Sequence, residues 1–469
     1  MKNILGYYLM PHPPIIIPDI GKGEEKKIQK TIDACEKVGE EIKALKPETI
    51  VVITPHATMF SDAIAISNED RITGDLSQFG CSNIKMDIAI DREFNERLNL
   101  ACHLEGIPAA TVNADLLSNY NYEFKLDHGT MVPLYFINKY YRDYKLVHIT
   151  YSILGNMSLY KFGIEIQNVA KELGRNIVII ASGDLSHALK EEGAYKYSPY
   201  GEKFDNEFLD SLEKGNIDSL FSMDNTMIEE AAQCGLNSVN ILLGTLEGNN
   251  FKGELLSYEG PFGVGYGVMK LNREEKESSA LDFLIKAREE KLKKKLSEGN
   301  PYTRLARESL NYYFTNGSRM DDTSNLPSEL LSQKHGVFVS LKKFGALRGC
   351  IGTISPVTDS VAEEIIRNSI EAALEDPRFS PVNEFELDDI DISVDVLMDA
   401  VPASIEELDP KKYGVIVTRG YKRGLLLPDL EGVDSVEEQL SIACSKAGIN
   451  NNEDYEIEKF EVIRYKEGE

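Results

Sequence analysis

The sequence is poor in basic residues relative to acidic ones, and this deficit excludes one large class of partner. Its 469 residues include 51 Lys and Arg against 77 Asp and Glu, which gives a formal net charge of −26. Proteins that bind nucleic acid normally need a basic surface that meets the phosphates. We therefore expect no nucleic-acid partner for this chain.

Long hydrophobic runs are also missing. No stretch approaches the roughly 18 uninterrupted apolar residues that a membrane-spanning helix requires. The first segment, MKNILGYYLMPHPPIIIPDI, is partly apolar, but Pro11, Pro13 and Pro14 interrupt it and no small-residue cleavage site follows. The sequence therefore predicts no membrane partner, no secretory signal and a cytoplasmic protein.

Cysteine is scarce and scattered. The six cysteines form no C-x-x-C pair and no Cys/His cluster with zinc-finger spacing. This distribution favours a reduced compartment and argues against a disulfide framework.

The first part of the chain, residues 1–272, shows the pattern of an α/β domain with a mainly parallel sheet. Short β-branched runs alternate with amphipathic helical stretches, which is the pattern that right-handed crossover connections produce. The glycine-rich segment 260–271 fits a last strand better than a phosphate loop, because a phosphate loop must open a helix. The clearest predicted strands are 49–54, 145–150 and 176–181, and the clearest helices 26–45 and 164–173.

A second, different domain follows. Residues 273–300 are dominated by charge and are expected to form a linker and a solvated helix that includes 286–295. The domain boundary is expected near 272–278. From 301 to 469 the pattern is that of an α+β domain, with predicted helices at 305–314 and 360–374 and predicted strands at 336–341, 390–398 and 414–418.

Four histidines stand at or near the predicted ends of strands or in loops. His56 follows the strand 49–54, His187 follows the strand 176–181, and His12 follows the apolar segment GYYLM. His128 lies in the segment LDHGTMVPL, which we expect to be a loop. Because the carboxyl ends of parallel strands line one crevice, these side chains are expected to converge.

Converging imidazoles suit a divalent metal. Two histidines with one anionic ligand leave positions open for substrate and oxygen, an arrangement typical of non-haem Fe(II) sites. The alternative for each histidine is a loop cap or a bond to a backbone group, and we expect such structural roles for His103 and His148.

These histidine segments carry a resemblance to a known family. MPHPP, ITPHA, LDHGTMVPL and SGDLSH, in this order, resemble the LigB-type extradiol ring-cleavage dioxygenases and the related Memo proteins over residues 1–272. The resemblance implies that His12 and His56 bind ferrous iron. It implies that His187 is the general acid/base and that His128 lines the pocket for dioxygen and a catechol-like aromatic substrate.

The third ligand departs from the ring-cleaving pattern. Ring-cleaving members place a glutamate near residues 229–244, whereas Memo-like members have a cysteine before glycine; here Gln233 and Cys234 precede Gly235. We predict Cys234 as the third ligand and rank Glu229 and Glu230 below it. A small buried residue at a helix start is the structural alternative for Cys234.

The second domain has its own candidate site in FGALRGCIGTISP, residues 344–356. Arg348 is a candidate carboxylate or phosphate ligand and Cys350 a candidate nucleophile, with Asp376 as a candidate acidic neighbour or as the end of a helix. The alternative is a structural turn with a buried cysteine. The segment LRGCIGT and the stretch from about 280 onward resemble the AMMECR-type domain.

The fused arrangement resembles the proteins of the AmmeMemoRadiSam system, which implies a separate radical SAM protein as partner, because no C-x-x-x-C-x-x-C motif is present. The main expectation is an Fe(II)-dependent oxidoreductase of the extradiol dioxygenase superfamily with an accessory AMMECR-type domain. The alternatives are a Memo-like metal-binding or scaffold protein without ring cleavage, and a zinc site that performs hydrolysis.

Overall fold

The computed structural model describes residues 3–191, 193, 195–274, 279–321, 326–343, 345–430, 432–450 and 453–468. Part of the predicted charged linker, residues 275–278, and Phe344 lie outside this set. The chain forms two compact units, Met1–Lys286 and Ala287–Glu469. Within the described residues, no helix has both the length and the apolar character needed to cross a membrane.

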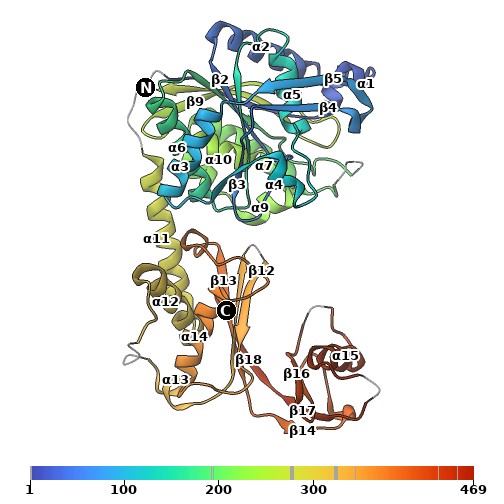
Figure 1. The fold of residues 1–469 in the computed structure, drawn as a ribbon, viewed down its shortest axis with the longest axis vertical. Helices are drawn as coiled ribbons and strands as arrows, with labels where there is room; N and C mark the ends of the chain where they lie inside the picture. The colour runs from blue at the N-terminus through green and yellow to red at the C-terminus, as the bar shows by residue number, and fades with distance from the viewer. Residues whose placement is uncertain are drawn as a thin grey trace. The chain divides into compact units, whose positions relative to one another are not determined.

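Unit 1 is built on one eight-stranded sheet in the order β6-β3-β7-β2-β8-β1-β10-β9 (Figure 1). Four of its pairings are parallel, including the central run β7-β2-β8-β1, while β3 against β7 and both pairings of β10 are antiparallel. The predicted α/β fold with a mainly parallel sheet is confirmed. The strands are β1 (Ile4–Met10), β2 (Thr49–Thr54), β3 (Ile64–Ser67), β6 (Ala109–Val112), β7 (Lys145–Thr150), β8 (Ile177–Ser182), β9 (Asn250–Glu259) and β10 (Tyr266–Glu274).

Helices cover both faces of this sheet, and the strands are buried on both sides. Along β2, Ile50 and Val52 join the core beneath α2 (Gln29–Leu45) and α5 (His128–Ile137), whereas Val51 and Ile53 join the core on the opposite face. Burial on both faces explains the uninterrupted apolar runs of the central strands. The other helices of unit 1 are α1 (Pro18–Gly21), α3 (Arg92–Leu104), α4 (Ala114–Ser118), α6 (Asn156–Glu172), α7 (Pro199–Lys214), α8 (Ile217–Phe221), α9 (Asn225–Glu230) and α10 (Leu236–Gly244).

A separate hairpin of β4 (Arg71–Leu76) and β5 (Cys81–Ala89) stands outside the main sheet. Its strands are largely exposed and polar, so their sequence lacks the apolar signal by which the central strands were found. The glycine-rich segment does run into a strand, β10, as predicted.

Unit 2 has two four-stranded antiparallel sheets, β12-β11-β13-β18 and β14-β17-β15-β16, which confirms the α+β prediction. The segment around Cys350 is strand β12 and not the turn considered from its glycines. The helices of unit 2 are α11 (Ala280–Glu298, which begins in unit 1), α12 (Pro301–Asn316), α13 (Ser328–Ser332), α14 (Val361–Leu374) and α15 (Val436–Ala447). Its strands are β11 (Val337–Lys343), β12 (Ala346–Gly352), β13 (Ile390–Leu397), β14 (Val401–Pro402), β15 (Gly414–Arg419), β16 (Lys422–Leu426), β17 (Glu456–Phe460) and β18 (Val462–Lys466).

Candidate metal centre

The candidate site lies at one edge of the unit 1 sheet, where three parallel strands end. His12 follows β1, His56 follows β2, and His187 follows β8. Since β2, β8 and β1 are adjacent and parallel, their carboxyl ends meet at this edge. The order of the strands therefore brings together residues that are up to 175 positions apart in the sequence.

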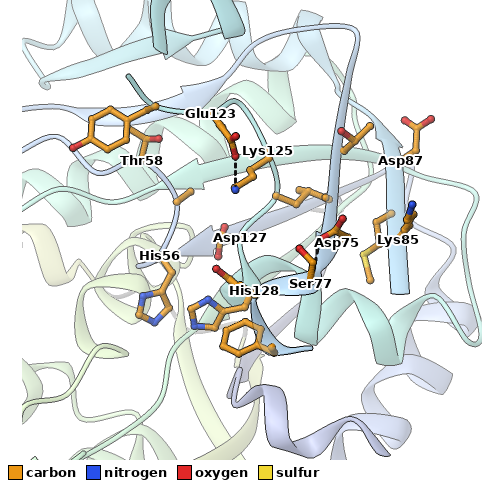
Figure 2. Close-up of a pocket in the computed structure, with 18 of the residues that line it drawn as sticks. His56, Thr58, Asp75, Ser77, Lys85, Asp87, Glu123, Lys125, Asp127 and His128 are labelled. Carbon is orange, nitrogen blue, oxygen red and sulfur yellow. Dashed lines mark hydrogen bonds and ion pairs between the residues drawn. The ribbon is translucent and has the colours of Figure 1, made fainter. Parts of the chain in front are cut away.

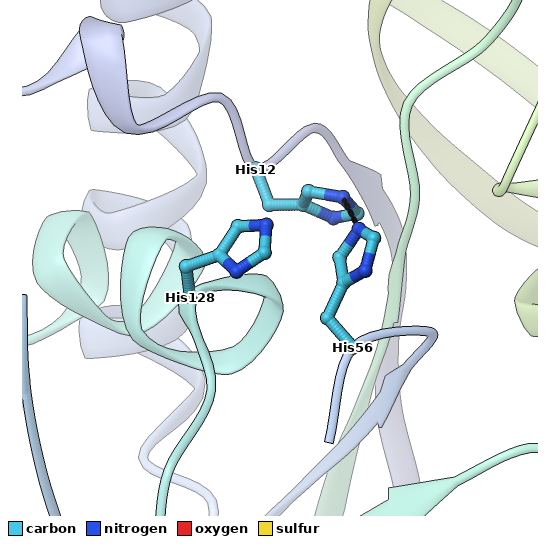
Figure 3. Close-up of side chains that lie close together, drawn as sticks. All are labelled: His12, His56 and His128. Atoms are coloured by element: carbon cyan, nitrogen blue, oxygen red, sulfur yellow. Dashed lines mark hydrogen bonds between the residues drawn. The ribbon is translucent and has the colours of Figure 1, made fainter. Parts of the chain in front are cut away.

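Three imidazoles converge at this edge (Figure 3). The Nε2 atoms of His12 and His56 are 2.9 Å apart. One ring nitrogen from each of His12, His56 and His128 lies within 4.8 Å of the other two, and the rings of His56 and His128 are stacked. Atoms bonded at about 2.1 Å to one ion lie roughly 3 to 3.5 Å apart. The His12–His56 pair is close to this spacing, whereas the limit of 4.8 Å for the whole trio is wider.

Hydrogen bonds behind His12 fix its tautomer. The Ser182 hydroxyl donates to the carbonyl oxygen of Gly129 at 2.5 Å, so it can only accept from His12 Nδ1 at 2.9 Å. The proton of His12 therefore sits on Nδ1, and the Nε2 lone pair points at His56. A ring held by its second nitrogen in this way is the usual support of a metal-binding histidine.

Burial keeps the imidazoles uncharged. The pKa of His12 lies well below its usual value, first because the ring is buried and then because His56 and His128 repel a proton there. The same causes, burial and then His128, lower the pKa of His56 to about 4, and burial lowers that of His128. Neutral imidazole is the form that binds metal.

His128 is the first residue of helix α5, so the prediction of a loop at this position is wrong. The preceding Asp127 is the N-cap of the helix and accepts a hydrogen bond from the backbone N–H of Thr130 at 3.0 Å. Even Pro133 lies inside the helix. Proline usually disfavours a helix interior, but the buried apolar residues of α5 stabilise the helix around it.

Asp127 also ties the helix to two strands. Its carboxylate accepts from the Thr54 hydroxyl at the end of β2 at 2.7 Å and is 3.1 Å from His148 Nε2 on β7. Burial opposes the charge, but the contacts with His148 and Thr54 hold the pKa of this carboxyl below its usual range. Asp127 thus fixes His56, two residues beyond Thr54, relative to His128.

His148 has the structural role expected for it, and its partner was missed in the sequence. The His148 ring is buried between Ser67 and Asp127, with Nδ1 2.8 Å from the Ser67 hydroxyl. The signal that could have identified Asp127 is its place directly before a helix start, where Asp commonly caps. His103, also expected to be structural, is exposed in the last turn of α3.

Cys234 lies beside the histidines, just before α10. Its Sγ is 3.6 Å from His12 Nε2 and 3.9 Å from His187 Nε2, and it accepts from the backbone N–H of Asp184 at 3.3 Å. Burial, followed by the Asp184 charge, raises the pKa of the thiol. The three side chains whose ligand atoms all lie within 4.8 Å of one another are nevertheless His12, His56 and His128, and Cys234 is not among them.

The carboxylate of Asp184 lies close to this cluster, with Oδ2 4.0 Å from His12 Nε2, but the residues that adjoin Cys234 in the sequence do not extend it. Gln233 accepts from the backbone N–H of Leu236 at 2.8 Å, and Glu229 and Glu230 are exposed on α9. Asp184 accepts from the His12 backbone N–H at 2.9 Å, and burial raises its pKa to about 7.

His187 lies next to Cys234, with Nε2 3.9 Å from the sulfur. Burial, followed by repulsion from His56, lowers its pKa to about 4, so the ring is neutral at pH 7 and able to accept a proton. The ring of Tyr195 lies next to it, with 5.2 Å between the ring centroids.

A cavity of about 1270 Å³ opens onto His56 and His128. Figure 2 shows these two rings side by side at one end, with Asp127 behind them. The rest of the lining comes from residues 57–59, from the loop around residues 121–126 and from the β4–β5 hairpin. The hairpin that the sequence did not predict is therefore a wall of the candidate site.

The two predicted residues of unit 2 have different surroundings. The guanidinium of Arg348 forms a two-pronged ion pair with Glu386, at 2.9 and 3.0 Å, and also donates to the carbonyl oxygens of Ser380 and Pro381. Cys350 Sγ accepts from the Ser340 hydroxyl at 3.2 Å, and its backbone N–H donates to Asp376 at 2.8 Å. The guanidinium of Arg348 is therefore already paired with other residues of unit 2. Cys350, in contrast, lines a cavity.

The fold and the site together define a class: an α/β domain with a histidine cluster at the carboxyl edge of its parallel strands. The chain belongs to the family described as the catalytic LigB subunit of aromatic ring-opening dioxygenase, which it matches over residues 6–269. Residues 303–468 match the AMMECR1 family.

Relatives match the chain over different shares of its length. A protein of Clostridium acetobutylicum is 54% identical and covers 99% of this chain and 100% of its own length. A protein of Thermotoga maritima is 51% identical, over 36% of this chain and 98% of its own length. A crystal structure from Pyrococcus horikoshii is 32% identical over 37% of this chain and 92% of that one, with a TM-score of 0.34.

Proposed function

We propose that unit 1 is an Fe(II)-dependent oxidoreductase of the extradiol dioxygenase superfamily that acts on a catechol-like or related aromatic compound. The observation that carries this proposal is the convergence of the neutral imidazoles of His12, His56 and His128, the last two of which line a large cavity. Membership of the LigB family supports the same class of chemistry. Zinc or another divalent metal is the alternative occupant.

The residues present fit a metal ion. His12 Nε2 is unprotonated because Ser182 holds the other nitrogen, and His56 Nε2 faces it at 2.9 Å. In the proposed set these two nitrogens and the Cys234 sulfur are the ligands. A bound ferrous ion would supply a site at which a diol and dioxygen meet.

The remaining side chains have separate proposed tasks. His187 accepts the proton of a substrate hydroxyl, since its imidazole is neutral at pH 7. His128, which faces the cavity, orients the substrate or dioxygen. Asp127 holds the helix start at His128 and the end of β2 in fixed positions through its hydrogen bonds.

One observation favours a second candidate, a Memo-like metal-binding protein without ring cleavage that works with a separate radical SAM protein. The residue beside His12 is a cysteine, whose sulfur is 3.6 Å from Nε2, and no carboxylate belongs to the histidine trio in the described part of the chain. Histidine and thiolate ligands also suit zinc, and a zinc site would be expected to catalyse hydrolysis.

The experiment that tests the proposal is metal analysis of protein purified without oxygen, followed by an oxygen-consumption screen with catechols. We expect one iron per chain and oxygen uptake with at least one diol. The variants His12→Ala and His56→Ala should lose the metal while the far-ultraviolet circular dichroism stays unchanged. Full metal content in either variant would contradict the ligand assignment.

A matched pair of thiol variants identifies the third ligand. Cys234→Ser should reduce bound iron, whereas Cys350→Ser, in the other unit, should leave it unchanged. If His128→Ala removes the metal and Cys234→Ser does not, the third ligand is His128. Iron without oxygen uptake would support the Memo-like candidate, and activity that appears with zinc would support hydrolysis.

A further inference from the structure

One face of the sheet β12-β11-β13-β18 in unit 2 is polar. Along β11, Val337, Val339 and Leu341 are buried in the core with α12 and α14, so Phe338, Ser340 and Lys342 point to the opposite side. Directly across from Ser340 lie Cys350 on β12 and Ser393 on β13, and Ser393 in turn faces Lys466 on β18.

The glycine before Cys350 explains which way this cysteine points. A Cβ on Gly349 would lie 2.1 Å from the carbonyl oxygen of Ala372 in α14, so the helix backbone presses on the core face of β12 at that residue. The next residue along the strand, Cys350, therefore faces away from the helix, toward the polar side.

A cavity of about 750 Å³ lies against this polar face. Its opposite wall comes from the second sheet of unit 2, through β16 and the residues that follow it. The apolar part of that wall includes Leu425, Leu427 and Leu430, while Arg423 and Lys446 also lie along it. The volume is typical of small-molecule sites.

The charged residues around the cavity are mostly basic, although the chain as a whole carries −26. Three acidic side chains line it, Asp391, Asp395 and Glu467. The basic residues are twice as many: Lys342, Arg378, Arg423, Lys446, Arg464 and Lys466.

Two of these guanidinium groups are held in position beside the cysteine. Arg378 pairs with Asp376 through Nε and Nη2, at 2.9 and 2.6 Å, and Arg464 pairs with Asp395 through the same two nitrogens, at 2.8 and 3.0 Å. These two ion pairs use Nε and Nη2 and leave the Nη1 group of each arginine outside them, and Arg378 also bonds to Cys350. Each is therefore fixed by an aspartate and still able to donate to an anion.

We propose that this cavity is a second ligand site, which binds an organic carboxylate with an apolar body. Arg378 and Arg464 hold the carboxylate, and the leucines of the opposite wall pack against the apolar part. Cys350 lines the same cavity and is covered when the ligand is bound. The assignment is independent of the metal centre, because every group it uses belongs to unit 2.

The test uses Cys350 of the full-length protein as a reporter. Its alkylation by iodoacetamide is followed by mass spectrometry with phenylacetate, 4-methylpentanoate or octanoate present. We expect at least one carboxylate to slow alkylation of Cys350 severalfold. Phenylacetamide, acetate and inorganic phosphate, which lack either the charge or the apolar body, should have little effect.

Variants link the protection to the arginines. Arg378→Met and Arg464→Met should each weaken the protection, whereas Arg419→Met, a change of equal charge on β15 outside the cavity lining, should not. If either methionine variant fails to fold, Arg378→Lys is tested in its place. This variant should also weaken the protection, because lysine cannot form the two-pronged contact.

Two outcomes would overturn the proposal. One is the absence of protection by all three carboxylates, and the other is equal protection by phenylacetate and phenylacetamide. The comparison between acid and amide is made on the unaltered protein, so it does not depend on the folding of any variant.

Discussion

At the residue scale, the chemistry of the metal centre depends on which nitrogen of each histidine is free. His12 is oriented by Ser182, whose own hydroxyl is committed to Gly129. The ring of His187 is anchored less firmly: among the described residues, its side-chain hydrogen-bond contact is with the Cys234 sulfur at 3.9 Å. The more loosely held ring of His187 suits proton transfer better than metal binding, whereas the anchored ring of His12 suits metal binding.

The variant His187→Ala should therefore retain its metal and lose turnover. We expect kcat to fall by about 10²- to 10⁴-fold, the usual contribution of a general acid or base, with iron content unchanged. His103→Ala, an exposed histidine on α3, is the matched control and should leave kcat unaltered. An unaffected rate in the His187 variant would remove this residue from the mechanism.

At the element scale, the N-terminus of α5 connects the site to the sheet. Asp127 caps the helix, receives the Thr54 hydroxyl from the end of β2 and contacts His148 on β7. Removing this carboxylate would leave several buried donors without an acceptor, each at a cost of about 1–3 kcal/mol.

Asp127→Ala should accordingly lower the free energy of unfolding of unit 1 by on the order of 3 kcal/mol and weaken metal binding. Asp224→Ala removes an exposed N-cap from α9 and is the matched control, with an expected loss of about 0.5–1 kcal/mol. The loss of unfolding free energy in each variant is measured by urea denaturation followed by circular dichroism, because the chain has no tryptophan whose fluorescence could be used. Equal losses in the two variants would contradict the role given to Asp127.

At the scale of the whole molecule, the two units differ in their response to acid. Unit 2 contains one histidine, His335, whereas unit 1 contains the other six. In folded unit 1 the pKa values of four histidines are lowered from 6.5, so below that pH the unfolded chain binds protons that the folded unit does not. Acidification from pH 6.5 toward 4 therefore destabilises unit 1.

Two carboxyl groups act in the opposite direction. Burial raises the pKa of Asp184 to about 7 and that of Asp205 to about 6, so the folded unit keeps protons that the unfolded chain has released. These two groups oppose the four histidines over the same pH range, and the histidines are the more numerous set. In unit 2, Asp376 has a pKa lowered to about 2 by its pair with Arg378, and its contribution to stability is lost only below about pH 4.

We expect metal-free protein to show this difference in hydrogen exchange. As the pH falls from 6.5 to 4.5, the amides of unit 1 should lose more protection than those of unit 2, after correction for the intrinsic exchange rate. Mass spectrometry of peptides from each unit reports the two separately. A greater loss in unit 2 would contradict the prediction.

The sequence by itself determined the two fold classes and the main positions of the site. Continuous apolar runs at 49–54 and 145–150 are strands because they are buried on both faces, and His12, His56 and His187 follow strand ends that parallel pairing must bring together. These features depend on local pattern and on chain order, both of which are visible in one sequence.

Only the tertiary structure decided the rest. The hairpin that forms a cavity wall, the helix that begins at His128 and the link from Asp127 to His148 all depend on contacts between distant segments. The same is true in unit 2, where Glu386 occupies Arg348, and where Arg378, Arg464 and Cys350 line one cavity. A residue's partners in space are set by the packing of whole elements, and the local pattern around that residue does not contain them.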